Sequence, residues 1–225
     1  MTPKPVPLLQ WKFDETTGTT ADDSSLNNFD GTYVGTPVSD ANVPPGAPGD
    51  PASLKFDGSM RQAVTRAPTP PLLKPANNVT VSAWYRATDV DSMALTKTGA
   101  EIVSAGNSYL LRLGPGGVEF TKNTAGGFKQ CKVDAPAHLN GQWHHVAGVT
   151  SPTEGLIVYF DGAPICNHPA DTQDVIYTGQ GPDLFVGRHG NGEEQWDFTG
   201  SLDDVRIYGS ALTADQIMSI HRNTF

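Results

Sequence analysis

The segment best suited to contact a ligand lies near the C-terminal end of the sequence. Arg188-His189-Gly190-Asn191-Gly192 is followed by Trp196. Planar side chains that donate and accept hydrogen bonds suit sugar hydroxyls, and an aromatic ring packs against the C–H face of a pyranose. We therefore treat Arg188, His189, Asn191 and Trp196 as candidate ligand-binding residues. A second interpretation stays open, in which the glycines form a turn and Trp196 packs at the start of the next strand.

The motifs that indicate catalysis are missing. There is no Gly-x-Ser-x-Gly nucleophile elbow and no His-Glu-x-x-His zinc helix. Glu193-Glu194 with Asp197 is an acidic cluster, but it falls in the loop Gly190 to Gln195 and lacks the alternation by which one strand presents two carboxylates. We expect a solvated loop there. His145 lies inside a strand-like run, so we expect a hydrogen-bonded structural histidine rather than a catalytic base.

Short β-strands must position these residues, because apolar or alternating runs are separated throughout by turn residues. In Val79–Tyr85 the odd positions are apolar and two of the three even ones are polar, which is typical of a strand with one buried face. Asp161-Gly162 follows an apolar run and predicts a hairpin turn, and Asp57-Gly58 repeats the signal. So many short strands indicate two stacked antiparallel sheets. The predicted strands are Leu8–Phe13, Thr32–Val34, Ser53–Phe56, Gln62–Thr65, Val79–Tyr85, Glu101–Ala105, Tyr109–Leu113, Val118–Thr121, Lys129–Val133, Trp143–Val149, Leu156–Phe160, Leu184–Gly187 and Leu202–Tyr208.

One segment near the C-terminus has the pattern of a helix. Thr213 as N-cap and Gln216 three residues later form a capping box, and Leu212 and Ile217 are spaced as a hydrophobic staple. The pattern predicts a short helix over about Ala214 to His221, lying against the sandwich.

Composition narrows the range of partners. The chain has 225 residues and a formal net charge of -9, which would repel a nucleic-acid backbone. No run approaches the ~20 apolar residues of a membrane-spanning helix, and the first residues lack the apolar stretch of a signal peptide, so the chain as written carries no leader. Cys131 and Cys166 both fall in strand-like runs. A cross-strand disulfide and two buried thiols are equally open.

Several segments, taken in order, carry a resemblance to a known family. They are Leu9–Glu15 with Gly18, Asp23–Asn28, Asp30–Thr32, Val79–Trp84, Trp143–Ala147, Val158–Gly162, Gly200–Tyr208 and Ala211–Thr213. Together they make the sequence similar to the laminin-G-like, concanavalin A-like jelly-roll domains of secreted proteins. The resemblance implies an all-β sandwich of two antiparallel sheets with one short C-terminal helix, spanning residues 1–225 as a single domain. Trp84 and Trp143 each lie inside a predicted strand, so we expect them to pack in the core or on a sheet face rather than to contact a ligand.

The resemblance also implies a structural calcium ion where the first loop meets the last long strand. The loop Asp22–Asn28 is dense in the oxygen atoms that Ca²⁺ takes as ligands. Asp203 has the parity of Val205 and Ile207, so we expect its carboxylate on the buried side of the strand, where a cation would neutralise it. Asp23 and Asp203 are the expected ligands, and Asn28 is a weaker one. The alternative for Asp203 is an aspartate at a strand end capped by backbone amides.

We expect a non-catalytic module that binds a glycan or polysaccharide. Its setting would be a secreted, extracellular or periplasmic protein, with other domains of a larger host protein as further candidate partners. Glycosidases that resemble this fold carry a Glu-x-Asp-x-x-Glu strand, which places two carboxylates close together, and no such string occurs here. A glycoside hydrolase or polysaccharide lyase stays open as an alternative, because fold alone does not fix function. A structural or adhesion domain that binds other proteins is a third.

Overall fold

The computed structural model shows a sandwich of short strands. It describes residues 3–46, 49–58, 61–89, 100–105, 108–114, 116–134, 138–177, 183–189 and 196–224. The strands are β1 Leu9–Trp11, β2 Thr20–Ala21, β3 Gly31–Val34, β4 Val38–Asp40, β5 Ser53–Asp57, β6 Ala63–Arg66, β7 Val79–Arg86, β8 Ala100–Ala105, β9 Tyr109–Gly114, β10 Gly117–Thr124, β11 Gly127–Asp134, β12 Trp143–Ser151, β13 Gly155–Phe160, β14 Ala163–His168, β15 Leu184–Val186 and β16 Thr199–Tyr208. The helices are the 3-10 turn η1 Pro71–Leu73 and the α-helix α1 Ala214–His221.

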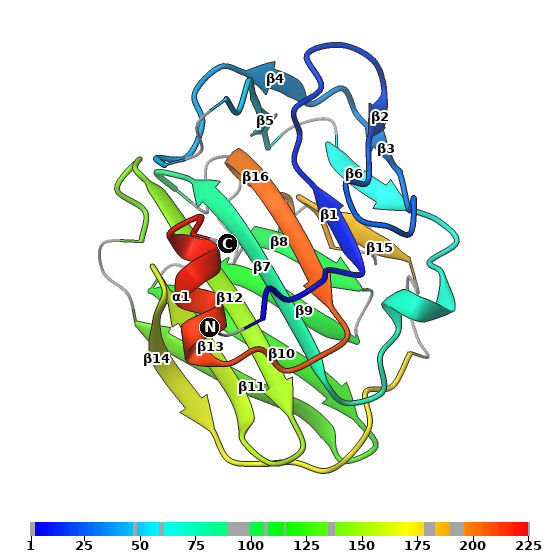
Figure 1. Ribbon diagram of the computed structural model, residues 1–225, viewed down its shortest axis with the longest axis vertical. Coiled ribbons are helices and arrows are strands. Elements are labelled where there is room, and N and C mark those ends of the chain that lie inside the picture. Colours follow the sequence, from blue (N-terminus) through cyan, green and yellow to red (C-terminus); the bar gives the residue numbers. More distant parts are fainter. Residues whose placement is uncertain are drawn as a thin grey trace.

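Two antiparallel sheets form the layers (Figure 1). Sheet A has the order β14-β13-β12-β7-β16-β5-β4, and β1 pairs with β16 beside this path. Sheet B has the order β11-β10-β9-β8-β15-β6-β3-β2. The chain passes repeatedly between the sheets, so residues distant in sequence become neighbours within each layer. The predicted fold class is confirmed.

Alternation along the strands separates the core from the two outer faces. On β7, Val81, Ala83 and Tyr85 enter the core between the sheets, while Trp84 points to the outer face of sheet A. On β12, Gly148 lets the sheets approach closely, because a Cβ atom there would lie 2.2 Å from Cδ2 of Phe120 on β10. Each strand therefore presents one set of side chains to the core and one to an outer face.

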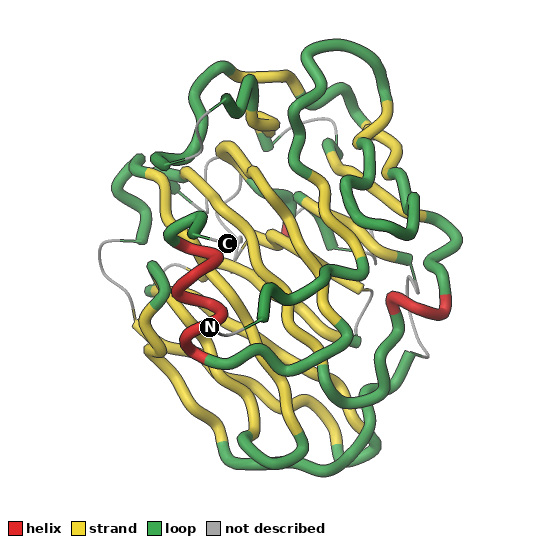
Figure 2. The backbone as a smooth tube through the Cα atoms, in the orientation of Figure 1, coloured by secondary structure: helices red, strands yellow, loops and turns green. Residues whose placement is uncertain are grey.

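The predicted helix is confirmed with its capping box. Thr213 Oγ1 accepts a hydrogen bond from the Gln216 N–H, and Gln216 Oε1 accepts one from the Thr213 N–H. Leu212 and Ile217 are buried in one cluster with apolar side chains of β12, β13 and β16, so α1 covers part of the outer face of sheet A. Both ends of the chain lie beside α1 on this side of the sandwich (Figures 1 and 2).

Every predicted strand exists, with ends shifted by a few residues, and the structure adds β2, β4 and β14. The Asp161-Gly162 hairpin is confirmed, since β13 and β14 pair around it and both residues have positive φ. The Asp57-Gly58 hairpin was wrong. Gly58 does turn the chain at φ 73°, but β5 belongs to sheet A and β6 to sheet B, so the connection crosses between layers.

A disulfide joins the two sheets at one edge of the sandwich. Cys131 on β11 and Cys166 on β14 are bonded, with 5.9 Å between their Cα atoms. Both strands are edge strands of their sheets. The sequence left open a disulfide or two buried thiols, and the structure contains the disulfide. The bond covalently links two strand edges that packing alone would otherwise hold together.

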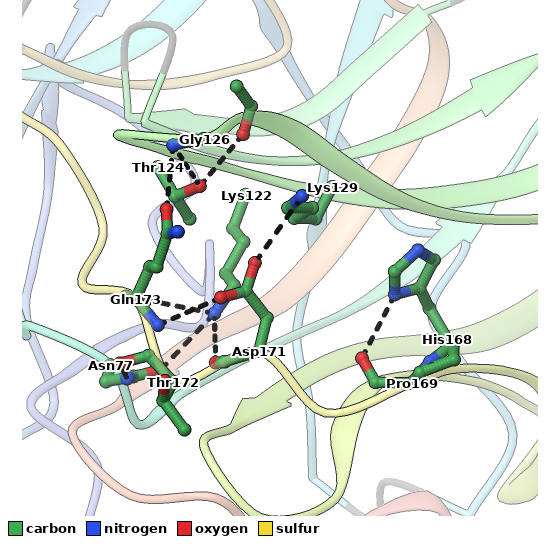
Figure 3. Close-up of polar contacts among 11 residues, drawn as sticks. Asn77, Lys122, Thr124, Gly126, Lys129, His168, Pro169, Asp171, Thr172 and Gln173 are labelled. Atoms are coloured by element: carbon green, nitrogen blue, oxygen red, sulfur yellow. Dashed lines mark hydrogen bonds and ion pairs between the residues drawn. The ribbon is translucent and has the colours of Figure 1, made fainter.

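A buried lysine fastens the loop that follows β14 (Figure 3). The Lys122 Nζ on β10 is fully buried and donates to Asn77 Oδ1 at 3.3 Å, to the Asp171 carbonyl at 3.0 Å and to the Gln173 carbonyl at 3.2 Å. Lys129 on β11 lies 3.8 Å from the Asp171 carboxylate. Three acceptors match the three protons of an ammonium group, which offsets its burial.

Candidate functional site

The first of the expected calcium ligands is fully engaged with protein groups. Asp23 Oδ1 accepts hydrogen bonds from the N–H groups of Gln10 and Ser25, each at 2.9 Å. Its Oδ2 accepts from the Ser25 hydroxyl at 2.7 Å and the Phe29 N–H at 2.8 Å. These bonds fold the first loop onto β1 and give both carboxylate oxygens of Asp23 protein partners. Asn28 is exposed on the same loop.

Asp203 does not lie on the face that its parity predicted. The pairing of β16 with β7 shifts register between Asp203 and Arg206, and Asp204 has φ 45°. This bulge puts Leu202 and Val205 together in the core, so Asp203 points to the outer face of sheet A, beside Trp84. The expectation of a core-facing Asp203 was therefore wrong, although the side chain is buried, at 1% exposure.

Three carboxylates gather around Asp203 in a cavity of about 190 Å³. Asp14 follows β1, Asp50 precedes β5 and Asp204 is the next residue of β16. Burial first, and then the charges of Asp50, Asp204 and Asp14, raise the pKa of Asp203 to about 9. Burial, a hydrogen bond shared with Asp14 and the charge of Asp14 raise the pKa of Asp50 to about 6. The remaining lining residues are Gln10, Lys12, Pro44, Pro45, Gly46, Gly49, Trp84, Arg206, Ile220 and Asn223.

Two oxygen atoms of this cluster lack partners. Asp203 Oδ2 and Asp50 Oδ1 are buried and accept no hydrogen bond from the residues that the structure describes. Asp204 instead pairs with Arg206, at 2.5 Å, and accepts a bond from Gln10. In the described ranges no three His, Cys, Asp or Glu side chains are arranged as a metal site, so an ion here would need backbone or water oxygens as well.

The expected ligand-binding residues lie on the other side of the molecule, over the outer face of sheet B. The Arg188 guanidinium carbon lies 5.4 Å from the ring centre of Phe185 on β15, and the His189 and Trp196 rings are 6.2 Å apart. Trp196 is half-buried, whereas His189 is buried at 4% exposure. Asn191 falls outside the described residues. The contacts bring Arg188, His189 and Trp196 to one region.

Arginine and glutamate side chains on sheet B support this aromatic group. The Arg112 guanidinium lies over the Trp196 ring, 4.8 Å from its centre. Glu119 Oε1, on the neighbouring strand, accepts bonds from Arg112 Nη2 at 2.5 Å and from the Thr121 hydroxyl at 2.9 Å. Glu119 is buried, so its charge is matched by a fixed guanidinium. Trp196 thus rests on an ion pair held by two paired strands.

Burial lowers the pKa of the Arg188 guanidinium, and the nearby charge of Arg61 adds to this, while Asp197 opposes it. The Arg188 Nε is buried with no hydrogen-bond partner in the described part of the chain. The Nε–H of Arg188 is therefore a candidate donor to an oxygen atom of a ligand.

A histidine group lies under α1 and takes no part in either site. His145 is fully buried between Trp84 and His221, with ring centres 5.4 and 5.8 Å away. The predicted hydrogen bonding of its ring is wrong, since neither ring nitrogen has a partner among the described residues. Trp84 stacks on His221 on the sheet face, which agrees with the packing role expected for it.

Sequence reasoning missed four residues of these regions. Arg112 and Glu119 sit at matching positions on adjacent strands, a pairing that follows from register and not from spacing in the sequence. Asp14 and Asp50 join Asp203 only through the folding of β1 and the loop before β5. Asp14 did fall within a segment that carried the family resemblance, which was the available signal.

Comparison with known protein sequences identifies a relative of this chain. A zebrafish (Danio rerio) relative, adhesion G-protein coupled receptor V1, is 30% identical over 91 residues, which is 40% of this chain and 1% of the receptor. The chain therefore spans a very small part of that relative.

Solved structures show the same fold. One is domain 4 of AbnA, a GH43 extracellular arabinanase from Geobacillus stearothermophilus, in complex with arabinotriose, with 19% identity, TM-score 0.66, and coverage of 97% of this chain and 100% of that one. Another is the binding domain of Paraclostridial Mosquitocidal Protein 1, with 11% identity, TM-score 0.75, and coverage of 97% and 52%. Over residues 57–218 the sequence matches a family model, and the chain belongs to the concanavalin A-like lectin/glucanases superfamily.

Proposed function

We propose that this domain binds carbohydrate without cleaving it, through the outer face of sheet B around Trp196. The observation that carries the proposal is the half-buried Trp196 ring, which packs against the Arg112 guanidinium and lies beside the His189 ring. An aromatic ring fixed beside guanidinium groups offers both a stacking surface and hydrogen-bond donors for sugar hydroxyls. The likeness to a domain in complex with arabinotriose supports the same class of ligand.

The placement of the carboxylates favours binding over hydrolysis. A glycosidase needs two carboxyl groups on either side of the same bond. In the described residues the clustered carboxylates, Asp14, Asp50, Asp203 and Asp204, line a cavity on sheet A, while Trp196 lies over sheet B. Glu119 is near Trp196 but is paired with Arg112. Within the described ranges, the clustered carboxylates therefore lie away from the proposed sugar site.

A glycan array probed with labelled protein tests the proposal. We expect binding by the wild type that is lost in Trp196→Ala. Trp143→Ala is the matched control, because Trp143 is half-buried at the start of β12 in sheet A and its Nε1 donates to Asn42. A blank array for the wild type, or equal loss in both variants, would show that the sheet B site is wrong. Release of reducing ends from a bound polysaccharide would favour the glycosidase alternative.

We also propose that a calcium ion stabilises the fold at the cavity beside Asp203. The unpartnered, buried oxygens of Asp203 and Asp50 fit a hard cation, which would neutralise carboxylates that otherwise repel one another. Asp23 does not fit, because both its oxygens are occupied by hydrogen bonds. This proposal keeps Asp203 as a calcium ligand and replaces Asp23 and Asn28 with Asp50.

Thermal unfolding with and without Ca²⁺ tests the calcium proposal. Binding to the native state alone gives about 2.7 kcal/mol at a hundredfold excess over the dissociation constant, or a rise in Tm of roughly 5–10 °C for a chain of this size. Asp203→Asn should abolish the rise. Asp23→Asn should lower the stability through lost hydrogen bonds but keep the rise. The opposite pattern would place the ion in the first loop, and no rise in the wild type would exclude the ion.

A further inference from the structure

The edge strand of sheet B carries an exposed strip that the proposed sugar site does not use. On β11, Phe128, Gln130 and Lys132 are exposed, while Cys131 between them is buried in the core. The alternation shows that these three side chains share the outer face of the sheet. Phe128 is 57% exposed, and in the described part of the chain it is the one aromatic ring among the large exposed hydrophobic side chains.

The register of sheet B connects this strip to Trp196. Lys132 pairs with Glu119 on β10, and Glu119 pairs with Arg112 on β9, which lies under the Trp196 ring. Phe128 is four residues along β11 from Lys132. At about 4.8 Å between strands and about 3.3 Å per residue, the backbone positions under Trp196 and at Phe128 are roughly 16 Å apart. This span is much longer than a single sugar ring.

We propose that the outer face of sheet B binds a linear oligosaccharide of several units, with Trp196 and Phe128 as stacking surfaces at its two ends. By the register, Thr121 and Gln130 lie between the levels of the two rings and Lys132 lies level with Arg112. Gln130 and Lys132 donate hydrogen bonds to sugar hydroxyls. The side chains of this face match the groups of an oligosaccharide. Aromatic rings pack against the C–H faces of the sugar units, and the polar side chains bind their hydroxyl groups. This inference rests on the proposed carbohydrate binding and names its substrate class.

The strand that carries the strip is held rigidly. Cys131 ties the middle of β11 to β14 through the disulfide. Lys129, pointing the other way, contacts Asp171 in the loop that Lys122 fastens (Figure 3). Phe128 and Gln130 therefore need little further ordering when a ligand binds, and pre-ordered contacts bind more tightly than mobile ones.

Calorimetric titration with arabino-oligosaccharides from the disaccharide to the hexasaccharide, and with xylo-, cello- and manno-oligosaccharides of the same lengths, tests the inference. We expect affinity to rise with length. Phe128→Ala should weaken binding of the hexasaccharide roughly threefold to tenfold and leave the disaccharide unaffected, as expected for the loss of one aromatic contact. Trp196→Ala should weaken both. Phe128→Tyr, which keeps the ring, should restore the wild-type profile.

The outcomes separate the two proposals. If every length binds equally and Phe128→Ala has no effect, the domain binds sugar at Trp196 alone and the extended site is wrong. Equal weakening of disaccharide and hexasaccharide by Phe128→Ala would likewise overturn it, since Phe128 would then not form a separate subsite. If no oligosaccharide binds and the glycan array is also blank, the carbohydrate function itself is wrong and the extended site falls with it. Thermal unfolding of each variant confirms that the exposed substitutions leave the fold intact.

Discussion

The buried imidazole of His145 is costly to charge. Burial is the main reason that the pKa of His145 falls to about 3, and the nearby charges of His221 and Arg206 add to it, against the opposing Asp204 and Asp161. Because this value lies below the usual one near 6.5, the unfolded chain takes up the proton first as the pH falls. The stabilisation present above about pH 6.5 therefore decreases from there toward pH 3.

His145→Phe should flatten this dependence. Replacing the imidazole with an apolar ring removes the proton that the unfolded state gains, which amounts to at most about 1.4 kcal/mol per pH unit. Urea unfolding at pH 7.5 and pH 5 should show a smaller loss of unfolding free energy for the variant than for the wild type. His168→Gln, at an edge position on β14, is the control and should keep the wild-type difference. Equal losses in all three proteins would contradict the role assigned to His145.

Residue roles could be predicted where they depend on near neighbours. The capping box of Thr213 and Gln216 and the turn at Asp161 follow from spacing alone. Asp203 could not be placed, because one extra residue in the β16 pairing reverses which side chains face the core. Asp50 meets Asp14 and Asp203 from distant segments, and Glu119 meets Arg112 only through the register of the β9–β10 pairing, which no local pattern fixes.

Elements were predictable when their residues had strong strand character. The three strands that the sequence did not predict are short or atypical: β2 has two residues, β4 ends in polar Ser39 and Asp40, and β14 contains Pro164. Proline cannot donate to a strand pairing, so it is tolerated in β14 because that strand lies at an edge. Each of these segments becomes a strand by pairing with a neighbour of clearer strand character: β2 pairs with β3, β4 with β5 and β14 with β13.

Gly148 on β12 tests how closely the layers pack. A methyl group there would meet the Phe120 ring of β10, so Gly148→Ala should destabilise the fold by about 1–3 kcal/mol in urea unfolding. Adding Phe120→Leu should recover part of the loss if the clash is the cause. Additive losses in the double variant would show that the two positions do not interact.

At the scale of the whole molecule, the Cys131–Cys166 disulfide joins both layers across 35 residues of sequence. Cys131→Ser with Cys166→Ser should lower the unfolding free energy by roughly 3–4 kcal/mol, because the unfolded chain is no longer constrained by that loop. Equilibrium urea unfolding of the double variant gives the measurement. A loss well below about 1 kcal/mol would mean that packing of β11 and β14 suffices to hold the edge.

The position of the chain ends determines which face of the domain stays accessible when the protein is immobilised through a terminal tag. The Pro3 carbonyl accepts a hydrogen bond from Gln216 of α1, so both ends leave from the sheet A side, with sheet B behind them in Figure 1. A tag fused at either end would anchor the domain with its Trp196 and Phe128 face directed into solution. Immobilisation through lysines would instead attach the protein in several orientations, and attachment through Lys132 would block that face. Biosensor measurements with the two attachments should differ for this reason alone.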